Sequence, residues 1–536
     1  MILTGYGTVD NTALKLSSNN LEDSLLASSP MAMTSVARWA MTMVVTLVLS
    51  TGVAHAQLPP GFDDGNDIWS TAVAPASCRA TDRPETGLQG EVTVGDRDSG
   101  RSTAGYTCNI DMVGQYQGDG AGFTSASYKN CIYVGSTFPH TDGVAVIDAA
   151  DPAHPRLTAT LREPAMINGT WESLKVNEKR GLLAGTGVPF IFGLGYISIY
   201  DIATDCARPR LLNEGRGSLP GVRIPMFTHE GGFSPDGNTY WASGQAWTSA
   251  VDVSDPTDPN VIWSAPAGLG EHGMAFTPDG DTMFMATLAG MNILDTSAIQ
   301  DRVAPGTTMH QLLPLQGYKH WHDGFISQHS IYVTYNGVPY VFNADESGSG
   351  GVKLFDVSDL ANPRLRSTVK LEINLPEHMD RWASSASSSG FFGYDAHYCS
   401  VDRQDDPQAL ACGWQQSGIR VFDVRDPDNI REIAYYNPPA QTGKQAELTN
   451  SVHATFGKLM AAPLSGTFAI ARSILQGNFQ ADGSITASRN SQLIGTDLSA
   501  DWCMSPPEFR GNMLVVTCSD NCFMALRLDP SVYPPR

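Results

Sequence analysis

The stretch VKLFDVSDLANPRL, residues 352–365, is one of several near copies of a single phrase in this chain of 536 residues. Further copies begin at Val144, Ile197, Ser249, Met291 and Ile419, and a more divergent copy begins at Cys522. Each copy is typical of a short strand of small and apolar residues, an Asp that can cap a turn, a turn that usually contains Pro, and a second strand. The phrase therefore predicts a repeated strand-turn-strand unit.

Another strand pair precedes each phrase. The tetrapeptides SPDG at 234–237 and TPDG at 277–280 are typical of hairpin turns, because Pro suits the second position and Gly supplies a positive φ angle. Each unit thus holds four short strands over roughly 40–65 residues, which is the spacing of propeller blades. Seven such units between residues 123 and 530 predict an all-β fold, a seven-bladed β-propeller. A β-solenoid would have far shorter repeats, and a Greek-key sandwich would not repeat internally.

The two ends of this repeat region are predicted to meet. The last unit ends near Leu528 without an outer strand, and the segment Leu88–Val94 resembles the outer strands in composition. We therefore expect an N-terminal strand at Leu88–Val94 to close the last blade and to remove its open edge. The predicted parts are an N-terminal extension at 57–86, the propeller at 87–530, an insertion at 440–500 between blades six and seven, and a tail at 531–536.

The N-terminal region has the pattern of an export signal. Residues 33–56 contain Arg38, a short apolar stretch from Ala40 to Leu49, and then Ala54-His55-Ala56, which is typical of a signal-peptide cleavage site. About ten apolar residues cannot cross a bilayer core of ~30 Å, and no other segment is apolar enough to do so. We expect cleavage near Ala56 and a secreted, periplasmic or cell-surface protein. Residues 1–32 are predicted to be unstructured, and a start at Met31 or Met33 would leave most or all of them untranslated.

Charge and cysteine content narrow the choice of partners and compartment. The formal net charge of −21 argues against nucleic acid as a partner, because phosphates require a basic surface. All nine cysteines follow the predicted cleavage site, in a compartment where disulfides persist. Cys399 with Cys412, and Cys503 with Cys518, flank apparent strand-turn-strand segments and are predicted to form cross-strand disulfides. An odd number of cysteines leaves at least one thiol free or paired outside the chain.

Four consecutive units place a His at one offset, four residues before the hydrophobic residue that begins the next segment. These residues are His229, His272, His322 and His397. In a closed ring, equal offsets place side chains at equal height around one axis, and converging imidazoles commonly bind Fe, Cu or Zn. We therefore predict a metal site at the axis. Acidic residues beside these histidines could orient the imidazoles; they are Glu230, Glu271, Asp323 and Asp395.

Two further residues are candidates for catalysis. Glu172 occupies the equivalent place in the second unit, and could serve as a carboxylate ligand or as an acid–base group. His453, in the predicted insertion, could reach the same mouth as a general base, or could be a surface residue of a loop. The remaining histidines of the central units, His310, His320 and His329, share no offset and are predicted to be surface or loop residues. A repeated His can also be an inherited structural residue that bonds between strands, so a structural role for the ring stays open.

The phrases VIDAADP, VDVSDPTDP, LFDVSDLANP and VFDVRDP resemble the repeats of LVIVD-repeat proteins, a family of secreted or surface bacterial β-propellers. The resemblance covers nearly all of residues 123–530. The phrases are more distantly similar to those of the selenium-binding protein and methanethiol oxidase family, and this similarity implies a propeller with metal-binding histidines. Two hypotheses follow. One is a secreted metal-dependent oxidoreductase that acts on a small apolar substrate, and the other is a non-catalytic binding or scaffold propeller with a surface partner.

Overall fold

The computed structural model describes most of the chain from Trp69 to Pro534. The described ranges are 69–136, 143–167, 169–187, 196–213, 230–244, 247–288, 290–302, 311–386, 392–444, 447–454 and 498–534. The chain divides into two units, and every described residue belongs to the second, Pro60–Arg536. The predicted signal peptide at 33–56, most of the predicted insertion and the last two residues of the tail lie outside the described residues.

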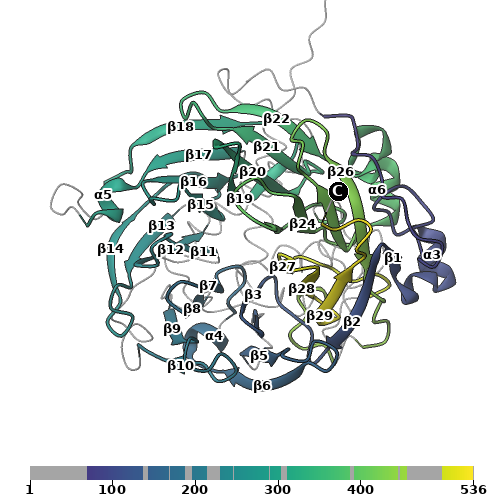
Figure 1. Cartoon of the computed structure of the whole chain (residues 1–536), viewed down its shortest axis with the longest axis horizontal. Helices are drawn as coiled ribbons and strands as arrows, with labels where there is room; N and C mark the ends of the chain where they lie inside the picture. The colour runs from purple at the N-terminus through teal and green to yellow at the C-terminus, as the bar shows by residue number, and fades with distance from the viewer. Residues whose placement is uncertain are drawn as a thin grey trace, which may run out of the picture. The chain divides into compact units, whose positions relative to one another are not determined.

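Seven antiparallel sheets follow one another around a common axis (Figure 1), which confirms the predicted all-β, seven-bladed β-propeller. Blade 1 comprises β3 Ser125–Tyr128, β4 Cys131–Val134, β5 Val144–Asp148 and β6 Arg156–Leu161. Blade 2 comprises β7 Lys175–Asn177, β8 Leu182–Gly187, β9 Tyr196–Asp201 and β10 Arg210–Leu211. Blade 3 comprises β11 Glu230–Phe233, β12 Thr239–Gly244, β13 Trp247–Asp252 and β14 Asn260–Ala265. Blade 4 comprises β15 Met274–Phe276, β16 Thr282–Thr287, β17 Gly290–Asp295 and β18 Leu315–His320.

The last two blades each include a strand from the N-terminal part of the chain. Blade 5 comprises β19 Phe325–Tyr335, β20 Val338–Ser347, β21 Val352–Asp356 and β22 Arg364–Val369. Blade 6 comprises β23 Cys399–Val401, β24 Ala409–Gly413, β25 Ile419–Asp423, β26 Arg431–Asn437 and the N-terminal strand β1 Tyr106–Cys108. Blade 7 comprises β27 Glu508–Arg510, β28 Met513–Cys518, β29 Cys522–Leu528 and the N-terminal strand β2 Ile110–Tyr116. The short helices are α3 Val94–Ser99, η1 Arg101–Ala104, α4 Pro164–Ile167, α5 Ser297–Gln300, η2 Glu372–Asn374, η3 Pro376–His378 and α6 Met379–Ser385.

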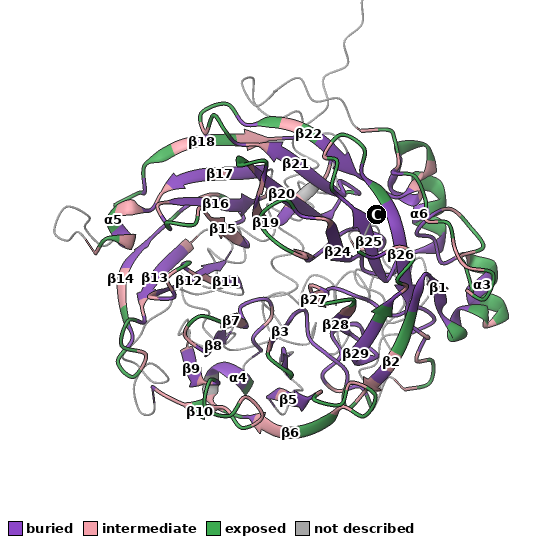
Figure 2. Ribbon diagram, viewed as in Figure 1, coloured by how far each residue is buried: buried purple, intermediate pink, exposed green. Residues whose placement is uncertain are grey.

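The repeated phrase forms the third strand of each blade and the turn that follows it. The conserved spacing has a local cause: the Asp at the end of the strand accepts a hydrogen bond from the backbone N–H two residues later, as Asp148 does from Ala150 (3.0 Å) and Asp356 from Ser358 (2.9 Å). The second strands, such as β8, β12 and β16, are buried along their whole length, whereas the outer strand β6 is largely open to solvent (Figure 2). The core therefore lies between neighbouring blades.

The last blade is closed by a different segment from the one expected. The strand β2 pairs antiparallel with β29, with Ile110 opposite Leu528, so closure by an N-terminal strand is confirmed, whereas the choice of Leu88–Val94 was wrong. Thr93 instead caps helix α3 by accepting a hydrogen bond from the Asp96 backbone N–H (3.0 Å). Val92 is fully buried in a hydrophobic cluster of blades 5 and 6, and Leu88 is partly buried against it, whereas Val94 is exposed. Side-chain packing, and not strand pairing, therefore holds this segment.

Four disulfides connect the described cysteines. The predicted pairs Cys399–Cys412 and Cys503–Cys518 are confirmed. Two more pairs, Cys78–Cys108 and Cys131–Cys206, join residues 30 and 75 positions apart and have no local sequence signature. Cys522 is the free thiol and is buried. The four bonds indicate an oxidising compartment. Within the described part of the chain, we find no helix with the length and apolar character needed to span a bilayer.

A buried ionic group fastens the segment before blade 1 to blade 6. Arg420 of β25 is fully buried, and its guanidinium lies 3.0 Å from Glu432 and pairs with Glu85. The ring of Tyr435 lies 4.7 Å from the same guanidinium. Since two carboxylates and an aromatic face surround one buried cation, removal of the cation leaves both acids without a charge partner.

We predict that Arg420→Met lowers the free energy of unfolding by about 3–5 kcal/mol, because it leaves Glu85 and Glu432 buried and unpaired. The matched control is Arg366→Met, which removes a half-exposed Arg366–Asp428 pair and is expected to cost less than about 1 kcal/mol. Unfolding of the wild type and both variants in guanidinium chloride measures the two losses of unfolding free energy. Equal losses in the two variants would contradict the inferred role of the buried group.

Candidate functional site

Side chains from four blades meet where the innermost strands begin. His272 and His397 precede β15 and β23, and Glu172 precedes β7. The fourth member, Glu346, lies at the end of β20, which runs antiparallel to β19 so that Ser347 is opposite Phe325. All four side chains are buried. We call this group the axial cluster.

Glu346 lies between the two imidazoles of the axial cluster. His397 Nε2 is 3.1 Å from Glu346 Oε2, and His272 Nε2 is 3.7 Å from Glu346 Oε1. Glu172 Oε1 is 3.6 Å from the same His397 Nε2. Glu346 therefore lies beside both ring nitrogens, and Glu172 lies beside that of His397.

Backbone carbonyls hold both rings in one orientation. His397 Nδ1 lies 2.9 Å from the carbonyl oxygen of Met504, and His272 Nδ1 lies 3.0 Å from that of Gly270. A carbonyl oxygen only accepts hydrogen bonds, so each Nδ1 carries a proton. In a neutral ring, Nε2 then presents a lone pair to a carboxylate, which is favourable only when a second proton or a metal cation lies between them.

Buried acids give the axial cluster an excess of negative charge. Burial, reinforced by the nearby charges of Glu230 and Glu346, raises the pKa of Glu172 well above its usual value. Glu230 is fully buried, its backbone bridges to that of Glu172, and its Oε1 lies 2.9 Å from Lys175 Nζ. Burial also raises the pKa of Glu230, and Lys175 opposes this shift. Three carboxylates thus share one buried region with a single lysine.

The remaining predicted ligands have different outcomes. His229 lies outside the described residues. His322 is exposed, in contrast to His272 and His397, so the described contacts do not place it in the cluster. The cause is the length of β19, which has 11 residues whereas β15 and β23 have 3 each, and which carries His322 beyond the level of the others. Glu346, on the neighbouring strand, occupies this blade's place, and no repeated offset in the sequence marked it.

The acidic neighbours of the histidines make other contacts. Glu271 accepts hydrogen bonds from Thr248 and from the backbone N–H groups of Ala267 and Gly268, and Asp323 pairs with Lys370 at 2.5 Å. Asp395 accepts a hydrogen bond from the Ser349 N–H, and burial raises its pKa to about 8. The carbonyls of Gly270 and Met504, and not these carboxylates, therefore orient the imidazoles.

His329 is a buried residue of β19, so its predicted place at the surface was wrong. Its ring stacks on Tyr398 with 4.4 Å between centroids, and its Nε2 lies 3.3 Å from the backbone N–H of Cys399. Burial, with a further contribution from the charge of Lys175, lowers its pKa to about 3. His329 is therefore neutral at physiological pH. His320 is a half-exposed residue of β18, and His310 lies outside the described residues.

His453 is fully buried, not a surface residue of a loop. Its Nδ1 lies 2.7 Å from Asp520 Oδ2, its ring stacks on Trp502, and Ser451 donates to the other oxygen of Asp520 at 2.7 Å. These contacts fasten residues 451–454 to the turn between β28 and β29. Its role as a general base remains a prediction, since no contact of the described side chains joins it to the axial cluster.

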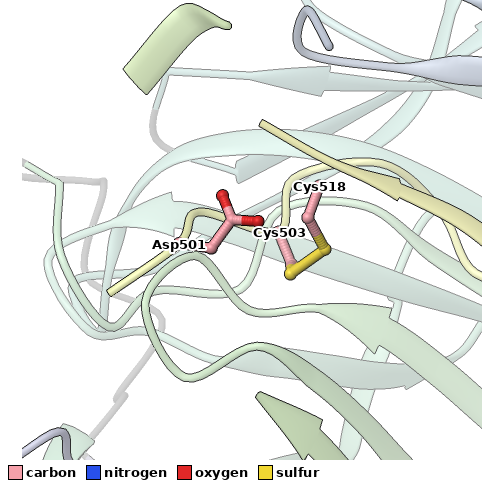
Figure 3. A group of neighbouring side chains, drawn as sticks. All are labelled: Asp501, Cys503 and Cys518. Carbon is pink, nitrogen blue, oxygen red and sulfur yellow. A yellow bond between two sulfur atoms is a disulfide. The ribbon is translucent and has the colours of Figure 1, made fainter. Parts of the chain in front are cut away.

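Two groups near His453 have the composition of metal sites. His453 with Asp501 and Asp520, and Asp501 with Cys503 and Cys518, are buried and hold their ligand atoms within 4.8 Å of one another, so each could hold a metal ion. In the second group, however, the two cysteines are joined by a disulfide (Figure 3). In the first, the Asp501 carboxylate already accepts four hydrogen bonds, from the backbone N–H groups of Trp502, Asp520 and Asn521 and from the Asn521 side chain. Both groups are better explained as structural clamps than as metal sites.

A cavity of about 390 Å³ lies along the innermost strands of several blades. Its lining includes polar and apolar side chains from five blades, among them Lys175, Glu230, Phe233, Met274, His329 and Tyr398. Glu230 and Lys175 belong both to the cavity wall and to the buried charges around the cluster. The cavity, which none of the four cluster residues lines, therefore lies beside these buried charges and has the size of a small molecule.

Comparisons with known proteins assign no family to the chain. No family model matches the chain, and no curated protein matches it. Among solved structures, a functionally unknown protein from Desulfotomaculum acetoxidans is 12% identical over 58% of this chain and 83% of its own, with a TM-score of 0.40. Hydrazine synthase from Kuenenia stuttgartiensis is 10% identical over 77% of this chain and 97% of its own, with a TM-score of 0.42. These scores are too low to carry an argument about function.

We predict that His329 makes stability fall as the pH falls. Its folded pKa of about 3 lies below the unfolded value of about 6.5, so the unfolded state takes up a proton first. The stabilisation is complete above about pH 6.5 and is lost progressively towards pH 3. We expect His329→Gln to show a shallower loss of unfolding free energy between about pH 6.5 and 4 in denaturant titrations.

The control for this experiment is His154→Gln, which changes an exposed His beside Asp151 and should follow the wild-type curve. Titration of the axial cluster occurs in all three proteins and cancels in the comparison. If the unfolding free energies of wild type and His329→Gln fall in parallel as the pH falls, the buried ring does not contribute to the pH dependence of stability.

Proposed function

We propose that this protein is an exported β-propeller of the LVIVD-repeat kind that binds a divalent transition metal in its axial cluster and acts as an oxidoreductase on a small substrate. The proposal depends on one observation. Two imidazoles, each with its Nδ1 proton directed to a backbone carbonyl, present their Nε2 atoms to the two oxygens of one buried carboxylate, Glu346. Hydrogen bonds from Nδ1 to a backbone carbonyl are the usual orienting contacts of imidazole ligands in metal sites.

The separations within the cluster suit metal binding. Metal bonds to imidazole nitrogen and carboxylate oxygen of ~2.0–2.2 Å place neighbouring ligand atoms about 3–3.5 Å apart. The separation of 3.1 Å between His397 and Glu346 lies in this range, and those of 3.6 Å for His397 and Glu172 and 3.7 Å for His272 and Glu346 lie just above it. Among the described atoms, His397 Nε2 and Glu172 Oε2 are buried and have no hydrogen-bond partner. A cation between them would satisfy both atoms.

The composition of the cluster narrows the choice of metal. A site of two imidazoles with carboxylates is typical of non-haem Fe(II), and also suits Zn²⁺. Cu, which the all-histidine prediction admitted, is less favoured when Glu346 and Glu172 replace two of the imidazoles. Bound iron would supply electron transfer with O₂ or a substrate, and bound zinc would supply Lewis acidity. The protein's own contribution is to exclude water, since all four side chains are buried.

Export is part of the same proposal. The disulfides support it, because they persist outside the reducing cytosol. The sequence pattern at 33–56 is consistent with a signal peptide that would deliver the chain there.

A scaffold propeller is the second candidate function. The separation of 3.1 Å between His397 and Glu346 also fits an ion pair between a protonated imidazole and a carboxylate. In that case the cluster would only tie blades 2, 4, 5 and 6 together at the axis. Such a protein would bind its partner through surface loops and would contain no metal.

We predict that the purified mature protein contains about one equivalent of a transition metal and that the double variant His272→Ala/His397→Ala retains less than about a tenth of it, because two of the ligands are lost. The matched control is His322→Ala, which removes an exposed His of the same repeat series and should leave the metal content unchanged. Elemental analysis of the three proteins measures this, with circular dichroism as the test of folding.

The conservative variant Glu346→Gln is measured as well, in case the double variant does not fold. It is expected to lose metal and to retain the fold. Absence of metal from the folded wild type, or equal content in wild type and Glu346→Gln, would favour the scaffold function.

A further inference from the structure

We infer that the cavity of about 390 Å³ binds a small monocarboxylate, whose carboxylate group accepts a hydrogen bond from Lys175 and whose apolar body lies against Phe233 and Met274. The inference concerns the cavity alone and goes beyond the proposed function, because no residue of the axial cluster lines the cavity. A cavity of this volume suits a molecule about as large as benzoate.

Lys175 is the cationic group that β7 directs to the cavity. Its side chain lies on the cavity wall and is 24% exposed. An ammonium group has three N–H donors. One is directed to Glu230 Oε1 at 2.9 Å, and the Tyr398 hydroxyl oxygen lies 3.5 Å from the same Nζ. Among the described residues the third donor has no acceptor, so a ligand in the cavity can supply one.

Two contacts restrict the Lys175 ammonium group before a ligand binds. One is the ion pair with Glu230, which has no exposed surface. The other is the ring of Tyr398, whose centroid lies 4.6 Å from Nζ and which stacks on the buried ring of His329. A free lysine side chain would lose rotamer freedom on binding a ligand. Because Lys175 is already held in place, the entropy lost on binding is smaller.

The hydrogen-bond acceptors behind the cavity wall are closed to a ligand. Glu230 Oε2 and His329 Nδ1 are both buried, so neither can contact a molecule in the cavity. The side-chain groups that a ligand can reach include the donors of Lys175 and, at the mouth, those of the exposed Lys179. The ligand group that suits this wall is therefore an acceptor.

The charges of the wall favour an acceptor with one negative charge. Lys175 is balanced by Glu230, and the exposed Glu178 lies 3.9 Å from Arg510. Lys179 then remains as one positive charge that no described carboxylate offsets. A cation would meet Lys175 without gaining a carboxylate partner inside the cavity. A neutral carbonyl would accept a weaker hydrogen bond than a carboxylate, because charge-assisted bonds are roughly twice as strong.

Apolar side chains determine the rest of the ligand. Phe233 on β11 and Met274 on β15 lie on the cavity wall and are only partly buried. Gly232 leaves space beside them: apart from its chain neighbours, an added Cβ atom would meet only Met274 within 4 Å. An apolar body in this space would remove both side chains from water. The favoured ligand therefore has a carboxylate at one end and an apolar group at the other.

The test measures the binding of benzoate, benzyl alcohol and benzylammonium to the mature protein by isothermal titration. Benzoate is expected to bind at least about tenfold more tightly than the other two, because it alone accepts a charge-assisted hydrogen bond from Lys175. Glu230→Gln is expected to tighten benzoate binding about tenfold, since it removes the negative charge that competes for Lys175. Equal affinities for the three probes, or no tightening in Glu230→Gln, would overturn the inference.

Two further variants test the contacts separately. The double variant Lys175→Met/Glu230→Gln removes both members of the ion pair, so no buried charge is left unpaired, and benzoate binding is expected to weaken at least about tenfold. Gly232→Leu leaves every charge in place and fills the space beside Met274, so it is expected to prevent benzoate binding even if the double variant does not fold. Undiminished binding in either folded variant would contradict the assignment.

The matched control is Lys129→Met, which removes an exposed lysine between β3 and β4, outside the cavity wall. Its affinity for benzoate should remain within about twofold of the wild-type value, because solvent screens distant surface charges. A loss as large as that of the double variant would show that overall charge, and not Lys175, determines the binding of benzoate.

Removal of metal separates this inference from the proposed function, because a carboxylate can also bind a metal directly. The titration is repeated after treatment with a chelator, with metal content measured on the same samples, and benzoate binding is expected to persist. Loss of binding together with the metal would overturn the role of Lys175. Metal without benzoate binding would refute the ligand class and leave the metal site intact. Benzoate binding to a protein that contains no metal as purified would refute the metal site and support the cavity inference.

Discussion

The pairing of β2 with β29 is the contact on which the rest of the structure depends, because it joins a strand from before the first blade to the last blade and so closes the ring. The preceding strand, β1, pairs with β26 on the outer edge of blade 6. Between the two strands stands Asn109, whose φ of 58° turns the chain from one blade to the next and whose side chain donates hydrogen bonds to the carbonyls of Ser77 and Ile433. One short segment thus holds two blades together and leaves no open edge between the ends of the repeat.

Closure explains how residues far apart in the sequence form one site. Each blade directs the start of its innermost strand to the axis, so Glu172, His272 and His397 come together although about a hundred residues separate successive members. Their positions are set by the packing between blades and by backbone carbonyls, which are rigid partners. Such rigidity is required when like charges are held at short range, since a flexible site would relax and separate them.

The parts of this arrangement that could be predicted from sequence are those that repeat or that are local. The phrase and its turns predicted the blades, and the disulfides that bridge neighbouring strands followed from the same units. Glu346 was missed because it stands on a second strand, where no offset recurs, and His322 was included because the extra length of β19 leaves no mark in the spacing. Leu88–Val94 was mistaken for a strand because apolar composition does not distinguish a segment that packs from one that pairs.

The buried charges give the strongest reason to consider the axis a functional site. A scaffold needs only apolar residues at its centre, and ion pairs in the interior of a protein are rarely more stabilising than apolar packing. Here three glutamates share the interior with one lysine, and two buried oxygens, of Glu172 and Glu230, have no partner among the described residues. A cation between Glu172 and Glu346 would give the unpartnered Glu172 oxygen a partner and would offset the excess of acidic groups at the axis.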